Sequence, residues 1–85
     1  MPETKVGVVT HYFGKPEVAM IKATDGPIAV GDRIHIKGQK TDHTQVVESM
    51  QVERQPVERA EIGQEAGIKI GVQVRDHDEV FKVTD

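Results

Sequence analysis

The segment from Gly26 to Gly38 (GPIAVGDRIHIKG) constrains the fold more than any other part of the sequence. Two glycine-containing turns precede a segment, 33–37, in which polar and apolar residues alternate strictly. Side chains along a β-strand point alternately to its two faces, so this pattern predicts a strand with Ile34 and Ile36 on a buried face. The opposite face, which is exposed to water, then carries the polar side chains of Arg33, His35 and Lys37.

Short segments of the same kind recur along the chain and are separated by turn residues. No segment is a convincing helix, and the pattern is typical of an all-β protein. We expect a small closed barrel rather than an open sheet, because closure removes exposed strand edges. Further strands are predicted at residues 5–12, 17–24, 66–72 and 79–84, and residues 44–55 are expected to form one long strand or a strand pair.

Three local features refine this prediction. Gly7 lies inside the first predicted strand, which indicates a bulge or a close approach of another backbone. The alternation breaks at Ser49-Met50, where a bulge or sharp bend would restore one inner face, and Pro56 is expected to end that strand. With only three aromatic residues in the chain, we also expect Phe13 or Phe81 to lie in the core.

The length of 85 residues predicts one domain spanning residues 1–85. The chain contains no cysteine, so apolar burial and backbone pairing must stabilise it without disulfides or thiolate metal sites. We find no targeting segment and no apolar run long enough to span a membrane. The expected protein is therefore soluble and cytoplasmic.

The charge distribution argues against non-specific binding of polyanions. The net charge is −3, and the acidic excess lies in residues 51–85, whereas residues 1–50 are balanced. Proteins that bind nucleic acids without specificity carry an excess of basic residues. Any contact with nucleic acid would therefore be local and made by a few residues.

Catalytic motifs are not evident in the sequence. Gly14-Lys15 lacks the remainder of a phosphate-binding loop, and the four histidines do not have the spacing of a compact metal site. Ser49 is the only serine, and a bulge explains its position. We expect no enzymatic activity, no metal site and no cofactor.

The polar face of residues 33–37 is the first candidate site. A small cationic stripe able to bind phosphates would be formed by Arg33, His35 and Lys37, with Lys40 in the following loop. The alternative is that these side chains are the ordinary solvated face of an amphipathic strand.

The ordered set of segments 7–10 (GVVT), 27–36 (PIAVGDRIHI) and 47–70 resembles the second domain of elongation factor Tu-type translation GTPases. This resemblance implies a six-stranded Greek-key β-barrel of the translation-protein type. In that family an acidic residue and an arginine on the long strand help to hold the 3′ end of tRNA. The arginine matches Arg54, whereas the acidic position is occupied by Gln51. The match does not include the GTPase domain, so no nucleotide is expected to bind this chain alone.

The small stand-alone "translation elongation factor-like" proteins resemble this chain most, and similar barrels occur at the C-terminus of collagenase-type peptidase-family proteins. Our first hypothesis is a non-enzymatic module that contacts RNA, tRNA or the translation machinery. The alternative is an accessory protein-interaction barrel that acts in trans with a peptidase-like or RNA-modifying enzyme. In either case the expected contact residues are Arg33, His35, Lys37, Gln51 and Arg54.

Overall fold

The computed structural model describes residues 2–15 and 17–84, and its regular elements are all strands. This confirms the prediction of an all-β protein. No helix in this part of the chain is long and apolar enough to cross a membrane. The strands are β1 (Glu3–Phe13), β2 (Val18–Ala23), β3 (Ile28–Ala29), β4 (Arg33–Lys37), β5 (Asp42–Val46), β6 (Met50–Val52), β7 (Gln55–Val57), β8 (Arg59–Ala60), β9 (Glu65–Lys69) and β10 (Glu79–Val83).

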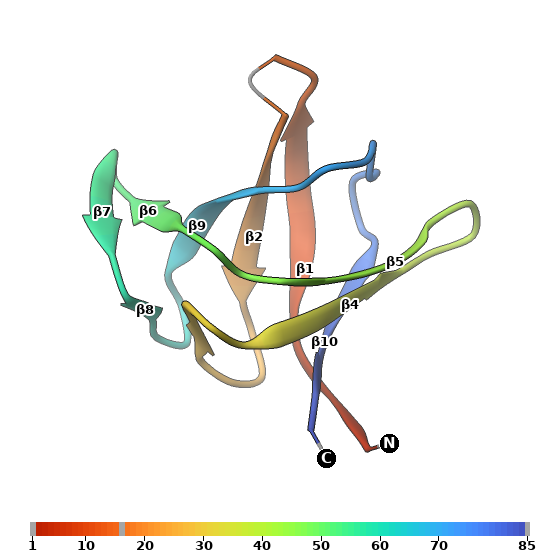
Figure 1. Ribbon diagram of the computed structural model, residues 1–85, viewed down its shortest axis with the longest axis horizontal. Helices are drawn as coiled ribbons and strands as arrows, with labels where there is room; N and C mark the ends of the chain where they lie inside the picture. Colours follow the sequence, from red (N-terminus) through yellow and green to blue (C-terminus); the bar gives the residue numbers. More distant parts are fainter. Residues whose placement is uncertain (1, 16, 85) are drawn as a thin grey trace.

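Eight strands form one antiparallel sheet in the order β5-β4-β10-β1-β2-β9-β6-β7, and β3 pairs with β8 in a separate two-stranded ribbon. The C-terminal strand β10 is inserted between β1 and β4, and β9 lies between β2 and β6. In Figure 1, β4 and β5 run across the direction of β1 and β2, so the sheet is strongly twisted and curved.

The predicted closed, six-stranded Greek-key barrel is not confirmed. The sheet order begins at β5 and ends at β7, and no ladder joins these two strands within residues 2–15 and 17–84. A side chain instead links β5 to the end of β9. Gln45 on β5 donates a hydrogen bond from Nε2 to the Lys69 carbonyl (2.9 Å), and its Oε1 accepts one from the Gly71 amide (3.3 Å).

The chain leaves the sheet between β5 and β6, where the sequence predicts a bend. Residues 47–49 belong to no strand, yet Val47 is fully buried and Met50 nearly so. The bend therefore keeps both side chains in the core, as the broken alternation suggests. The prediction that Pro56 ends the strand is wrong, because Pro56 lies within β7 at the sheet edge. A proline is tolerated there because its missing N–H group is not needed for a further ladder.

The core consists of aliphatic side chains. Ile34 and Ile36 are both buried, as the alternation predicts. The expectation that Phe13 or Phe81 lies in the core is wrong, because Phe13 is 46% exposed and Phe81 is only partly buried. The register of β10 explains the second case: Val80 pairs with Ile36 and Gly7 and takes the inner position, which turns Phe81 outward.

Gly7 combines the two features predicted for it. The register between β1 and β10 shifts between Lys5 and Gly7, which is a β-bulge at Val6. A Cβ atom on Gly7 would lie 2.3 Å from the Lys22 carbonyl oxygen on β2. Only glycine fits this position, because the obstructing atom belongs to the backbone of a paired strand.

We expect Gly7→Ala to lower the free energy of unfolding by about 2 kcal/mol or more, because β1 and β2 must separate to admit the methyl group. Gly14→Ala is the matched control, since a Cβ atom there meets nothing within 4 Å. Urea denaturation of both variants measures the difference. Equal stabilities would contradict the close approach at Gly7.

Candidate interaction surfaces

The structure places the five predicted contact residues on two separate surfaces. Arg33, His35 and Lys37 share the outer face of β4, as predicted. Gln51 lies on β6, and Arg54 lies in the turn between β6 and β7. Strands β4 and β6 are separated in the sheet by β10, β1, β2 and β9. The five residues therefore do not form one site.

The outer face of β4 has mixed charge. Lys37 pairs in register with Glu79 on β10 and with Asp42 on β5, while Lys5 on β1 forms a 3.3 Å ion pair with Glu79. Opposite charges on neighbouring strands partly cancel the field of the cations. The described face is thus an alternation of positive and negative side chains.

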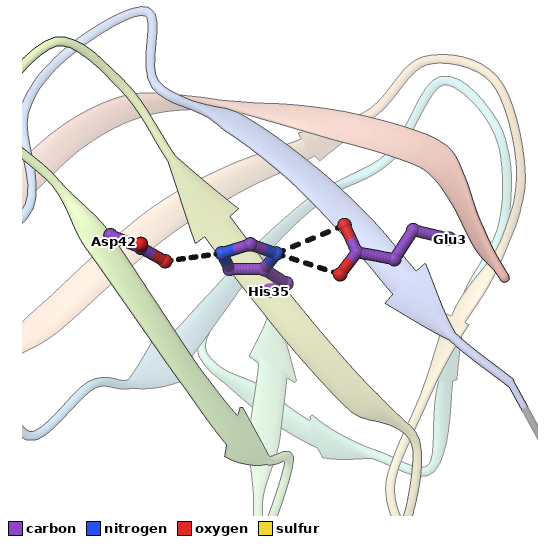
Figure 2. A network of polar contacts seen from close by, with 3 residues as sticks. All are labelled: Glu3, His35 and Asp42. Atoms are coloured by element: carbon purple, nitrogen blue, oxygen red, sulfur yellow. Dashed lines mark hydrogen bonds and ion pairs between the residues drawn. The ribbon is translucent and has the colours of Figure 1, made fainter. Parts of the chain in front are cut away.

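His35 is held between two carboxylates (Figure 2). Its Nδ1 lies 2.9 Å from both carboxylate oxygens of Glu3, and its Nε2 lies 2.5 Å from Asp42 Oδ1. Only 13% of the His35 side chain is exposed. A protonated imidazole donates from both nitrogens, so this arrangement favours the charged form.

The hydrogen bond to Glu3, followed by that to Asp42, raises the pKa of His35 above its usual value, and burial opposes this increase only in part. The two carboxylates contact opposite edges of the ring and cannot share one metal ion with it. Consistently, no group of three or more potential metal ligands occurs among the described residues.

The raised pKa of His35 makes the stability of the fold depend on pH. Protonated His35 contributes its full stabilisation below the unfolded pKa of 6.5, and this contribution is lost as the pH rises through the folded pKa. We expect the stability advantage of the wild type over His35→Gln to be larger at about pH 5.5 than at about pH 8.5.

Denaturation of both proteins at the two pH values, with an NMR titration of the His35 imidazole, measures this effect. Asp42→Asn should lower the His35 pKa, because it removes a charged acceptor. A His35 titration at or below pH 6.5 would show that the cluster does not hold the proton.

The second surface is a groove of about 800 Å³ on the outer side of the sheet. Its central row crosses five paired strands and consists of His11, Met20, Gly67, Gln51 and Pro56. Gly67 provides no side chain, and the side chains of Val18 and Met20 lie close above its Cα atom. The exposed Phe13 lines one end of the groove and packs edge-to-face on His11, with ring centroids 4.4 Å apart.

Arg54 lies in a turn and not on the strand that the resemblance implied. Val52 pairs with Gln55, which leaves Glu53 and Arg54 as a two-residue hairpin turn with φ values of 54° and 66°. Such turns favour Asn-Gly, because other residues adopt positive φ only with strain. The strained tip places both Glu53 and Arg54 in the lining of the groove.

Replacing the turn by Asn-Gly (Glu53→Asn with Arg54→Gly) should raise the free energy of unfolding by about 1 kcal/mol, because it relieves the positive-φ strain. Thermal unfolding measures the change. If the tip also contacts a partner, affinity for that partner falls while stability rises, which separates a functional role from a structural one.

A third surface was not predicted from the sequence. A depression of about 1,020 Å³ lies where the turn after β4 meets the turn at 75–78. Lys37 and Lys40 line it together with Arg75, which comes from a distant part of the chain. No local pattern signals this meeting, because it depends on the insertion of β10 between β1 and β4.

Comparison with known proteins gives a consistent result. The chain matches no family model. It is 35% identical over 81 residues to a protein named collagenase from Porphyromonas gingivalis, covering 94% of this chain and 22% of that protein. It is also 35% identical over 78 residues to an uncharacterized protease from Methanocaldococcus jannaschii, covering 91% of this chain and 19% of that protein. The chain thus spans about a fifth of the length of these relatives.

Solved structures show the same fold. The C-terminal domain of a "putative U32 peptidase" from Geobacillus thermoleovorans superposes with a TM-score of 0.86 at 20% sequence identity, covering 93% of this chain and 91% of that one. Its selenomethionine variant gives a TM-score of 0.84 at 19% identity, covering 89% and 95%.

These findings correct the assignment to an elongation factor Tu domain 2-like, translation elongation factor-like protein. The sequence relatives are named as proteases, and the matching fold is the C-terminal domain of a U32-type protein. A role in translation and binding of tRNA are not supported. The chain is similar in sequence to part of a protein named collagenase and of an uncharacterized protease, and it has the fold of the C-terminal domain of a "putative U32 peptidase".

Proposed function

We propose that this chain is a non-catalytic accessory domain that binds polypeptide for a peptidase-like protein. The observation that carries this proposal is the extent of the match: nearly the whole chain aligns with about a fifth of two proteins named as proteases. An aligned portion of that size suits an accessory domain, and the remaining length of those relatives leaves room for a catalytic domain.

The chemistry of the described residues agrees with a non-catalytic role. A serine nucleophile needs a base within hydrogen-bond reach. Ser49 and His43 line one shallow pocket, but the His43 Nε2 atom is hydrogen-bonded to Gln45 Oε1 at 2.8 Å. No hydrogen bond between Ser49 and a histidine occurs within residues 2–15 and 17–84.

The groove at Gln51 and Arg54 is the surface that we assign to a polypeptide partner. It has a floor of mixed apolar and polar side chains, an exposed aromatic ring at one end and a charged hairpin tip at the other. Such a combination of apolar and polar groups is common in surfaces that bind polypeptide chains. The outer face of β4, with Arg33, His35 and Lys37, would then lie outside this contact.

Affinity capture from a lysate, with and without nuclease, tests the proposal. We expect the tagged chain to retain an identified peptidase-like protein after nuclease treatment, and Gln51→Ala with Arg54→Ala to weaken this retention. Arg33→Ala is the matched control on the other surface. Recovery of RNA alone, or of a partner that nuclease removes, would contradict the proposal.

A further inference from the structure

We propose that the depression between the turn after β4 and the turn at 75–78 binds the carboxylates of an acidic polypeptide segment. This inference rests on the proposed function, since it specifies the chemistry of a polypeptide partner. It concerns a different surface from the groove at Gln51 and Arg54. Lys37, Lys40 and Arg75 supply the positive charge.

The two turns are fixed to each other and to β1. The Asp78 carbonyl accepts a hydrogen bond from the Val9 amide, and the Val9 carbonyl accepts one from the His77 amide, both at 2.8 Å. The side chain of Asp78 packs so closely against Gly38 that a Cβ atom on Gly38 would overlap its carboxylate. The depression is therefore built on a rigid base, which reduces the entropic cost of binding.

The charged groups of the depression leave an excess of free cations. Glu79 pairs with Lys5 at 3.3 Å, and the Asp78 carboxylate is buried and accepts the Arg75 amide at 2.9 Å. The lining thus holds four cations (Lys5, Lys37, Lys40 and Arg75) and three carboxylates (Asp76, Asp78 and Glu79), an excess of one positive charge. Of the cations, Lys37, Lys40 and Arg75 have no ion-pair partner among the described residues.

A residue with a strained backbone, His77, also lies in the depression. It has a φ of 74°, which is uncommon for a residue with a side chain. Its hydrogen bond to Val9 holds it there. Strained residues that the surrounding structure holds in place are concentrated at ligand-binding sites.

The surroundings favour a polypeptide over a nucleic acid. Every unit of a nucleic-acid backbone carries a phosphate, so negative charge would also lie beside Asp76 and Glu79. In a peptide, neutral residues can separate the carboxylates, so that only neutral positions lie beside these two acidic groups. Phe81 and Val8 also line the depression and offer apolar contact to a neighbouring side chain.

The test uses a fluorescent peptide of about ten residues in which glutamate alternates with glycine around one phenylalanine. The same peptide with glutamine in place of glutamate, and a single-stranded RNA of equal length, are the comparison ligands. We expect salt-sensitive binding of the glutamate peptide alone. Lys37→Gln, Lys40→Gln and Arg75→Gln should each raise its Kd by about three- to tenfold, while Lys15→Gln, an exposed lysine outside the depression, leaves it unchanged.

Lys37→Glu combined with Arg75→Glu should transfer the preference to a lysine-containing peptide, and circular dichroism confirms that each variant is folded. Any one of four results would overturn the inference. The variants could leave binding of the glutamate peptide unaltered, the glutamine peptide could bind equally well, RNA could bind more tightly, or the glutamate peptide could fail to bind at low salt. Capture of a peptidase-like protein through Gln51 and Arg54 would survive any of these results, so the two proposals fail separately.

Discussion

The strand β1 is the element on which the rest of the structure depends, because it is the longest strand (11 residues) and is paired with a neighbour on each edge. It pairs with β10 on one side and β2 on the other, and its Val6 carbonyl accepts the amides of Thr24, Asp25 and Gly26 at 2.9–3.4 Å. In a chain without cysteine, this backbone network and the aliphatic core must provide the stability. The bulge at Val6 bends β1, so that this strand can pair with β10 on one side and with β2 on the other side of a strongly curved sheet.

The local alternation of apolar and polar residues predicted where the strands lie, but it did not predict which strands pair with one another. The alternation at residues 33–37 correctly separated Ile34 and Ile36 from the polar face, and the break near Met50 correctly indicated a bend. Pairing between β10 and β4, however, joins segments distant in the chain, and no periodicity encodes it. The error at Phe81 and the overlooked approach of Arg75 to Lys37 both follow from this long-range pairing.

The resemblance to a translation factor domain misled for a physical reason. The segments that carried it are turns into alternating strands, such as residues 31–36, and such segments reflect the demands of a β-fold more than those of a binding site. Of the two residues that the resemblance implied, Gln51 lies on β6 and Arg54 lies in the strained turn between β6 and β7.

The two ends of the chain lie side by side (Figure 1), and the Thr84 amide donates to the Pro2 carbonyl at 3.0 Å. Glu3 also pairs with Val83. Because β1 and β10 pair with each other at this end of the sheet, fraying of either terminal strand breaks the same ladder. The first and last described segments are therefore stabilised together and lost together.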